Sequence, residues 1–316
     1  MDETAMGTAE GGPSSKNEMD THERGVLPAE DRPDLPTDDS DSDNSSCEEF
    51  DFITSQWENG VETGLQLNWP GSHRTITLNT KLTEDRIAPL FHGTQWAGTR
   101  VWKAAVVALE YLLETYPNGG SLLELGCGLG VPGMLWHLLQ ESSTSGSVVG
   151  DDVKFPPRVV LTDMPDLLPQ LKKNVKDNFT DFYGRSIEAK DLDWSTEGLQ
   201  KLWNDEADLL STESEDTYKS NNKMIFDICL NCDCIYEPLY GRDAWEALAD
   251  VLAEVARQSP GTVLVSSVER RAGDGLEDFV QRLEATGVVE SMKMALRNDD
   301  DPHHIIEIYI TQGKRI

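Results

Sequence analysis

With 316 residues, the chain is long enough for one large domain or two small ones, and its hydrophobic fraction of 38% is enough for a real core. Its net charge of −30 argues against a nucleic-acid binder, because the phosphate backbone would repel it. The charge suits a partner with a basic surface; acidic segments that only keep the protein soluble are the plainer alternative. No apolar run approaches the roughly 20 residues that span a bilayer, so we expect no membrane segment.

The N-terminus has no basic start followed by an apolar stretch, so it does not resemble a secretory signal. Five cysteines, an odd number in a chain of this size, do not suggest a disulfide framework and fit a reducing compartment. We therefore expect the protein in the cytosol or the nucleus.

The first 97 residues divide into two predicted segments. Residues 1–49 are rich in Ser, Asp, Glu, Pro and Gly, and we expect a disordered acidic tail. Residues 1–60 carry 17 acidic and 3 basic side chains, which is −14 of the total charge. In residues 50–97, "GLQLNW" and "RTITLNT" alternate apolar and polar residues with the period of a strand. This pattern predicts a β-rich lead-in.

From residue 98 onward, helical and strand-like patterns alternate. Helices are predicted at 98–116, 131–140, 165–179, 243–258 and 275–287, and strands at 121–125, 158–163, 186–194, 224–236, 262–268 and 303–311. Such alternation indicates an α/β fold with a mostly parallel sheet and helices on both faces. The last two strands predict an antiparallel pair at one edge. Two segments without periodicity, about 141–157 and 204–222, are interpreted as surface insertions.

A glycine-rich turn, "LELGCGLGVPG", follows the first of these strands, with Gly126, Gly128 and Gly130 at alternate positions. Gly128 to Gly133 also matches G-x-G-x-x-G, the fingerprint of dinucleotide-binding turns. In those folds an acidic residue about 20 positions further on holds the ribose. The next acidic strand end here is Asp163, 35 residues beyond Gly128.

Glu124 decides between the possible nucleotides. It lies two residues before the turn, on the strand that feeds it, so its carboxylate is expected to face the crevice. A carboxylate repels a pyrophosphate and holds an ammonium group. S-adenosylmethionine carries an ammonium group, a sulfonium and no phosphate, and it needs the close backbone approach that glycines permit. The turn therefore favours S-adenosylmethionine over NAD.

Several motifs, taken in order, resemble one family. E-L-G-C-G-x-G resembles motif I of the class I, seven-β-strand methyltransferases, and a narrower likeness covers roughly residues 98–310. There the chain is similar to the protein-lysine methyltransferases of family 16 in four segments, "GTRVWKAAVVALEYL", "LTDMPDLLPQLKKNV", "DLDW" and "LNCDCIYEP". The resemblance implies a Rossmann-like, seven-stranded methyltransferase domain over residues 98–316. It also implies S-adenosylmethionine as cofactor and a lysine of another protein as acceptor.

The resemblance also assigns cofactor contacts. Asp163 ends a strand, where a carboxylate can accept both ribose hydroxyls, although it could instead cap the following helix. Trp102 and Trp194 could be core aromatics, but at these motif positions the family has a Trp that borders the cofactor. The family often has Gly after the second Trp, where this chain has Ser195.

The Asp-x-x-Tyr motif supplies the expected catalytic residues. By resemblance, Asp233 lies beside the cofactor's methyl group and the target lysine, and Tyr236 shapes the acceptor pocket; core packing is the alternative for Tyr236. Cys232 would contact the cofactor through its backbone. Methyl transfer is an in-line displacement, so the enzyme must mainly position and desolvate a neutral amine.

The three cysteines at 229, 232 and 234 invite a metal interpretation, but no second Cys or His pair with zinc spacing accompanies them. We predict buried thiols and no metal. On a strand, Cys232 and Cys234 would share a face and Cys229 would oppose them. His303 and His304 are interpreted as structural.

Other functions remain compatible with these motifs. A related enzyme could methylate arginine, histidine or a small amine, because the acceptor pocket lies in variable loops. The domain could also bind the cofactor as an interaction module without turnover. An NAD-linked oxidoreductase is the third alternative, and it predicts binding of NAD.

Overall fold

The computed structural model describes residues 50–80, 97–144, 156–212 and 226–314. The predicted disordered tail lies outside the described residues. One compact unit, Ser45–Ile316, contains all the elements described below. None of the described helices is both long and apolar enough to cross a membrane.

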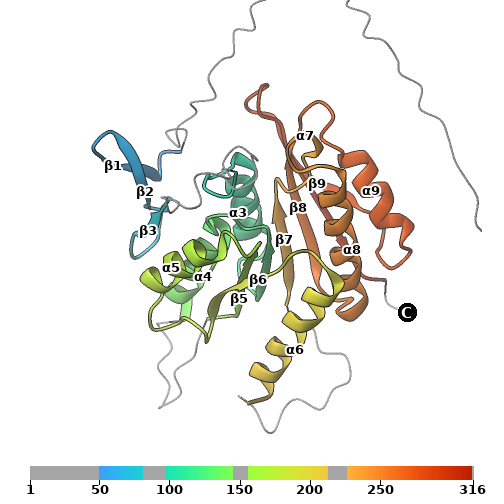
Figure 1. Ribbon diagram of the computed structural model, residues 1–316, viewed down its shortest axis with the longest axis horizontal. Coiled ribbons are helices and arrows are strands. Elements are labelled where there is room, and N and C mark those ends of the chain that lie inside the picture. Colours follow the sequence, from blue (N-terminus) through green and yellow to red (C-terminus); the bar gives the residue numbers. More distant parts are fainter. Residues whose placement is uncertain (1–49, 81–96, 145–155, 213–225, 315–316) are drawn as a thin grey trace, which may run out of the picture. The chain divides into compact units, whose positions relative to one another are not determined.

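A seven-stranded sheet forms the centre of this unit (Figure 1). Its strands are β4 Leu122–Leu125, β5 Val159–Asp163, β6 Ile187–Asp191, β7 Ile228–Cys232, β8 Val263–Glu269, β9 Lys293–Asn298 and β10 Ile306–Gln312. Their spatial order is β6-β5-β4-β7-β8-β10-β9. The first five strands in this order are parallel, and β10 runs antiparallel to both β8 and β9. The predicted Rossmann-like α/β fold, with a mostly parallel sheet of seven strands, is confirmed.

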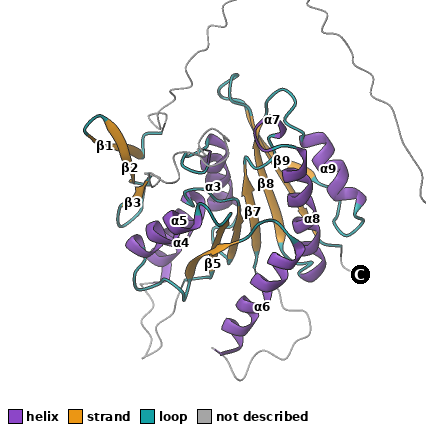
Figure 2. Cartoon of the chain, viewed as in Figure 1, coloured by secondary structure: helices purple, strands orange, loops and turns teal. Residues whose placement is uncertain are grey.

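Helices cover both faces of the sheet (Figure 2). The described helices are α3 Lys103–Thr115, α4 Val131–Thr144, α5 Leu168–Asn178, α6 Thr196–Thr212, α7 Glu237–Tyr240, α8 Arg242–Gln258 and α9 Leu276–Ala285. Helices α3, α4 and α5 contribute to one hydrophobic core, and α6, α8 and α9 contribute to the other. The two cores lie on opposite faces because neighbouring strand residues point to opposite sides. In β4, for example, Leu122 belongs to the first core and Leu123 to the second.

The predicted β-rich lead-in contains a small antiparallel sheet of β1 Ile53–Glu58, β2 Val61–Leu67 and β3 Ile76–Asn79. Asn59 and Gly60 join the first two strands with φ angles of +53° and +79°, the left-handed pair that a tight hairpin turn requires. The backbone of β3 is tied to α5, because the Asn174 and Asn178 side chains hydrogen-bond to it. The small sheet therefore packs on the α5 side of the unit.

Several elements differ from the sequence prediction, among them the short helix α7, which was not predicted. The second predicted insertion begins inside α6, whose buried residues recur at helical spacing at Leu199, Leu202, Trp203 and Glu206. The strand predicted at 224–236 is only the five-residue β7. Strand β9 was not predicted, because most of its side chains are exposed and show no alternation. The predicted antiparallel pair of β8 and β10 is confirmed, but β9 forms the edge.

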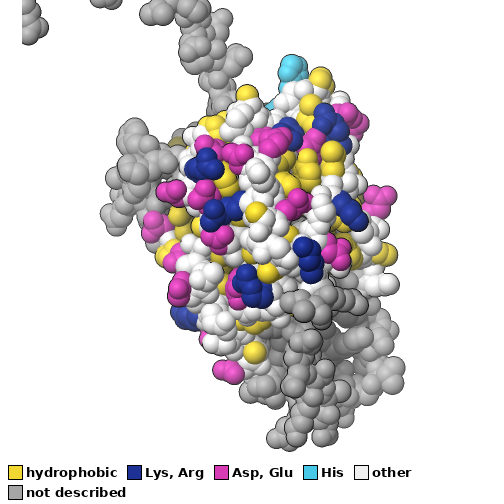
Figure 3. Space-filling model, turned by 90° about the vertical axis from the view of Figure 1, so that its right-hand side faces the viewer, with side chains coloured by type: hydrophobic (Ala, Val, Ile, Leu, Met, Phe, Trp, Pro, Cys, Tyr) yellow, Lys and Arg dark blue, Asp and Glu magenta, His cyan; other side chains and the backbone are white. Residues whose placement is uncertain are grey.

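On the side where α8 and α9 lie, acidic and basic side chains are interspersed (Figure 3). Several of these charges pair across the helices, such as Arg282 of α9 with Asp250 of α8 at 2.9 Å. The net negative charge of the chain is therefore not gathered into a single patch on this face.

A buried ion-pair network fastens α6 to the sheet. Glu206 is fully buried, and its carboxylate accepts two hydrogen bonds from the guanidinium of Arg158, both at 2.8 Å. Lys190 of β6 donates to the same carboxylate at 2.7 Å. These cations lower the pKa of Glu206 despite its burial. The network explains why an acidic residue lies on the inner face of α6.

We expect Glu206→Ala to lower the free energy of unfolding by about 3 kcal/mol, because it leaves the buried Arg158 without its main partner. Urea denaturation followed by circular dichroism measures this loss. Glu197→Ala, at an exposed position on the same helix, is the control and should change stability by no more than about 0.5 kcal/mol. Equal effects of the two substitutions would contradict the role given to the network.

Candidate functional site

A cavity of about 520 Å³ opens at the carboxyl ends of the central parallel strands. It is lined by the turn after β4, by Asp163 of β5, by Leu192–Trp194 after β6 and by Cys232 of β7. The strands β5 and β7 lie on opposite sides of β4, so the order of strands reverses here. Such a switch point opens a crevice that α/β proteins use for ligands. The volume lies within the range of roughly 300–1,000 Å³ that is typical of small-molecule sites.

The turn after β4 is built on left-handed backbone at Gly126 and Gly128, with φ angles of +60° and +54°. Both residues line the cavity. A Cβ atom on Gly126 would lie 2.8 Å from a ring carbon of Trp194 and 2.8 Å from the sulfur of Cys234. Glycine is therefore required both for the backbone conformation and for the close packing. Gly130 is not among the residues that line the cavity; it packs beneath the turn against side chains of β5 and α5.

Three N–H groups of this turn already donate hydrogen bonds within the protein. Cys127 donates to the carbonyl of Thr162 at 3.0 Å, and Gly128 donates to Oδ2 of Asp163 at 2.7 Å. Gly130 donates to the carbonyl of Cys127 at 2.7 Å. A turn that binds phosphate offers its N–H groups to the phosphate oxygens. This geometry therefore fits a dinucleotide poorly, as the position of Glu124 predicts.

Glu124 lines the cavity although only 1% of its surface is exposed. Its Oε2 accepts a hydrogen bond from the N–H of Gly133, at the start of α4, at 2.9 Å. Burial raises the pKa of Glu124 to about 8; the Gly133 hydrogen bond lowers it and the nearby Asp163 raises it. The protonated form therefore predominates at neutral pH unless a cation approaches, because an opposite charge favours the ionised form. At neutral pH, Glu124 would therefore carry its charge only next to a cation.

Asp163 ends β5 on the wall of the cavity. Its two carboxylate oxygens accept the N–H groups of Gly128 and Met164, each at 2.7 Å. Burial raises its pKa to about 6, and the two hydrogen bonds oppose that shift, so the ionised form predominates at neutral pH. The alternative interpretation of Asp163 as a helix cap is wrong, because α5 begins only at Leu168 and receives no side-chain cap. A carboxylate oxygen has more than one lone pair, so both oxygens can still accept a hydroxyl.

Both predicted tryptophans line the cavity and are partly exposed, and Trp194 also packs against the core on the α8 side. Trp102 directly precedes α3, and its Nε1 donates to the carbonyl of Ala97 at 3.0 Å. Trp194 has a φ angle of +53°, an uncommon conformation for a bulky residue. Its ring lies against Gly126 at the floor of the turn. The two aromatic surfaces thus form part of the cavity wall.

Ser195 stands where the resembled family often has Gly, and the structure explains this difference. Its hydroxyl donates to Asp193 at 2.7 Å and accepts the N–H of Gly198, in the first turn of α6, at 2.9 Å. Serine is a favoured residue at the start of a helix because its oxygen satisfies such an N–H. Ser195 therefore fastens the start of α6, the helix that the sequence pattern did not predict.

Asp233 and Tyr236, the predicted catalytic residues, are not among the residues that line the cavity. Asp233 has a φ angle of +54°, which turns the chain out of the sheet where β7 ends. It is 3% exposed; its Oδ1 accepts the N–H of Glu269 at 3.1 Å, and its Oδ2 accepts Nη1 of Arg271 at 2.8 Å. Burial raises the pKa of Asp233, while Arg271 lowers it. The ring of Tyr236 faces the same guanidinium, 4.9 Å from centroid to Cζ.

The cysteines are buried or partly buried thiols, as predicted, but they are arranged differently. Cys232 lines the cavity and packs against the core on the α3 side, whereas Cys229 and Cys234 belong to the core on the α8 side. The prediction that Cys232 and Cys234 share a face is wrong, because β7 ends before Cys234 and strand alternation stops there. Burial raises the pKa of all three thiols. Within the described ranges, no group of three or more His, Cys, Asp or Glu is placed to hold a metal ion.

Several cavity residues were not predicted. Tyr240 of α7 and Asp243 of α8 reach the cavity because the chain reverses after β7, and Asp193 lies between two residues of the "DLDW" motif that also line it. No periodicity marks these positions, since they come from turns and helix starts. With Glu124 and Asp163 they make the wall acidic: of the described lining residues, four are Asp or Glu, and one, Arg100, is basic. Such a wall favours a cationic ligand over an anionic one.

Comparison with known proteins supports the resemblance to methyltransferases that the sequence motifs predict. The family described as lysine methyltransferase matches residues 91–220. The chain is 31% identical to the secreted RxLR effector protein 48 of Plasmopara viticola, over 40% of this chain and 59% of the effector. It is 23% identical to the calmodulin-lysine N-methyltransferase of Arabidopsis thaliana, over 57% of this chain and 48% of that enzyme. The chain thus spans only about half the length of these curated relatives.

Among solved structures, the chain is similar to a TehB-like SAM-dependent methyltransferase from Corynebacterium glutamicum. The two share 16% identity over 73% of this chain and 97% of that one, with a TM-score of 0.37. It is also similar to the magnesium protoporphyrin IX methyltransferase of Synechocystis with bound SAH, at 10% identity over 74% and 89% of the two chains and a TM-score of 0.36. The family match and the Arabidopsis relative confirm the predicted resemblance to the lysine methyltransferases.

The raised pKa of Glu124 predicts a pH-dependent loss of stability. The unfolded chain ionises near the usual pKa of 4.5, but the folded protein resists ionisation until about pH 8. The stabilising contribution is therefore complete below pH 4.5 and is lost as the pH rises through 8. Glu124→Gln keeps an acceptor for Gly133 and cannot ionise. The free energy of unfolding of this variant, relative to that of the wild type, should rise by roughly 4 kcal/mol between pH 5 and 9.

Urea denaturation at a series of pH values measures this gain. Glu114→Gln, the same substitution at an exposed position of α3, is the matched control. Its free energy of unfolding should change with pH as that of the wild type does. A Glu124→Gln curve that also stays parallel to the wild type would show that Glu124 is ionised at its usual pKa.

Proposed function

We propose that this chain is an S-adenosylmethionine-dependent methyltransferase that methylates a lysine side chain of another protein. The observation that carries the proposal is the acidic cavity at the switch point of the sheet, where three N–H groups of the turn already donate within the protein. S-adenosylmethionine has two cationic groups and no phosphate, so both features suit it.

Each predicted contact has a side chain or backbone atom suited to it. Glu124 would ionise to hold the cofactor's ammonium group, next to the backbone of Gly126 and Gly128. Asp163 would accept the ribose hydroxyls with its remaining lone pairs. The rings of Trp102 and Trp194 supply flat apolar surfaces for the adenine and for the region of the sulfonium.

The acceptor is proposed on other grounds. The matching family is described as lysine methyltransferase, and the Arabidopsis relative is named for a lysine of calmodulin. Asp233, Glu269 and Tyr236 surround the guanidinium of Arg271, directly after Cys232 of the cavity wall, so their carboxylates and ring suit a long side chain that ends in a cation. A substrate with a basic surface also suits the charge of −30.

The protein's task in this reaction is positioning and desolvation. The cofactor supplies a methyl group on positively charged sulfur, so the chain needs no strong catalytic base. The Asp233 carboxylate would orient the incoming ammonium and hold its departing proton, and the rings of Trp102 and Tyr236 would exclude water. The nitrogen lone pair, freed of its proton, then lies in line with the bond that breaks.

Calorimetric titration tests the cofactor. We expect the protein to bind S-adenosylhomocysteine and not NAD, because the wall is acidic. At pH 7 binding should release about one proton, since the ligand's ammonium ionises Glu124, and Glu124→Gln should release about none. The number of protons follows from titrations in buffers of different ionisation enthalpy. Heat with NAD and none with S-adenosylhomocysteine would favour the oxidoreductase instead.

Transfer is tested with radiolabelled S-adenosylmethionine and a cell extract, followed by mass spectrometry of labelled proteins for methyl-lysine. Asp233→Asn keeps the shape of the side chain but removes its charge, so we expect the rate of transfer to fall by about a hundredfold or more. Affinity for S-adenosylhomocysteine should change little, because Asp233 does not line the cofactor cavity. Undiminished labelling by this variant would remove Asp233 from the mechanism. If the wild type binds the cofactor yet labels nothing, a binding module without turnover becomes the better interpretation.

A further inference from the structure

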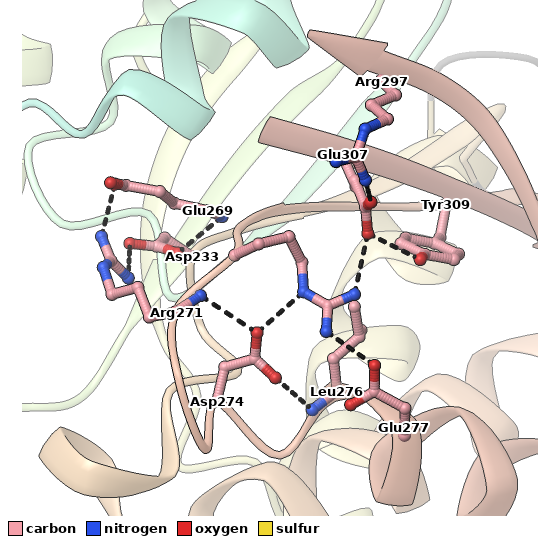
Figure 4. Close-up of polar contacts among 10 residues, drawn as sticks. Asp233, Glu269, Arg271, Asp274, Leu276, Glu277, Arg297, Glu307 and Tyr309 are labelled. Carbon is pink, nitrogen blue, oxygen red and sulfur yellow. Dashed lines mark hydrogen bonds and ion pairs between the residues drawn. The ribbon is translucent and has the colours of Figure 1, made fainter. Parts of the chain in front are cut away.

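Arg271 contacts the residues that the proposed function gives to the acceptor. Its Nη1 donates to Oδ2 of Asp233 at 2.8 Å and its Nη2 to Oε2 of Glu269 at 2.5 Å. The close-up shows the guanidinium of Arg271 pointing toward Asp233 and Glu269 (Figure 4). The neighbouring Arg270 donates instead to Glu307, at 2.9 Å. Two adjacent arginines thus have separate sets of partners.

Two aromatic rings complete the surroundings of this guanidinium. Its Cζ lies 4.9 Å from the ring centroid of Tyr236 and 5.5 Å from that of Trp102. Two carboxylates and two aromatic faces form a cage that recognises an organic cation. We call Asp233, Glu269, Trp102 and Tyr236 the cation cage.

The cage adjoins the cofactor cavity. Trp102 belongs to both, and Cys232, the residue before Asp233, also lines the cavity. With Arg271 in place, however, Asp233 is 3% exposed and is not among the residues that line the cavity. The carboxylate that would hold the incoming amine is therefore already occupied by a cation of the protein itself.

We propose that Arg271 is an internal stand-in for the substrate: it fills the cation cage at rest, and the lysine ammonium of the substrate displaces it. This inference rests on the proposed function and adds a gating residue to the same site. The class of ligand that can displace Arg271 is an alkylammonium on a long, flexible stem.

Charge balance explains why the two cations should exchange. Asp233 and Glu269 are both buried, and removing the guanidinium that bridges them would leave buried negative charge unpaired, which is strongly unfavourable. Glu269 keeps a second partner, because Nδ1 of His304 lies 2.6 Å from its other oxygen. Asp233 has Arg271 as its one ion-pair partner among the described residues. A lysine ammonium would restore the positive charge at Asp233.

The side chain of Arg271 can leave without movement of its loop. It is 23% exposed, so a path to solvent exists. Its backbone N–H is held by Oδ2 of Asp274 at 3.2 Å, and the same oxygen accepts Nε of Arg270 at 2.9 Å. Arg270 also donates to Glu277 and Glu307, so it fixes the backbone of this loop. Rotation of one side chain is therefore sufficient to open the cage.

The experiment uses the full chain saturated with S-adenosylhomocysteine and n-butylammonium as a probe of the cage. Titration followed by NMR gives the dissociation constant. We expect Arg271→Ala to bind the probe at least about tenfold more tightly than the wild type. Without the competing guanidinium, a larger fraction of the molecules has an empty cation cage that can bind the probe. Adding Asp233→Asn to this variant should abolish the gain. Arg282→Ala, which removes another carboxylate-paired arginine that does not line the cavity, is the matched control and should behave as the wild type.

Thermal melting provides a second measurement, since Arg271→Ala leaves buried charge unpaired. We expect its Tm to fall and n-butylammonium to restore it, with no such rescue of Arg282→Ala. Arg271→Gln retains hydrogen-bond donors for the two carboxylates and replaces the alanine variant if that one does not fold. Probe binding no tighter than that of the wild type, in a folded Arg271 variant that still binds S-adenosylhomocysteine, would overturn this inference. Failure of the wild type to bind S-adenosylhomocysteine would instead overturn the proposed function.

Discussion

The burial of carboxylates at the carboxyl ends of the parallel strands is the constraint on which the site depends. Glu124, Asp163 and Asp233 lie at or next to the ends of three adjacent strands, and each is almost completely removed from water. An isolated buried charge is costly, so each carboxylate must be neutralised, hydrogen-bonded or paired. The protein uses a different solution at each position, and these differences define the regions of the site.

At Glu124 the solution is a proton, which can be exchanged for a cationic ligand. Asp163 is stabilised by two backbone N–H groups, so it stays ionised and ready to accept further hydrogen bonds. Asp233 relies on a guanidinium from a distant part of the chain. The cost of burying a carboxylate thus has three different outcomes at one edge of the sheet. Glu124 responds to cations, Asp163 can accept hydroxyl groups, and Asp233 is already paired.

The two arginines that follow β8 show how neighbouring residues of the same type acquire different roles. Arg270 meets three carboxylates, from the loop, from α9 and from β10, and holds these elements together. Arg271 meets two carboxylates and two aromatic rings beside the cavity. The two side chains have different partners, so one stabilises the fold while the other reaches the site.

The sequence alone determined the alternating elements, the glycine turn and the positions of Glu124, Asp163 and Trp194 at the edge of the sheet where the cavity lies, because these features are local. A strand that leads into a glycine-rich turn and a helix brings such residues to one edge of a sheet whatever surrounds them. Only the tertiary structure decided that Asp233 is paired with Arg271, that Glu124 is protonated near neutral pH, and that α7 and α8 complete the cavity. Arg271 lies 38 positions beyond Asp233 in the chain, and burial and pairing depend on which distant segments the fold brings together, so no local pattern carries them.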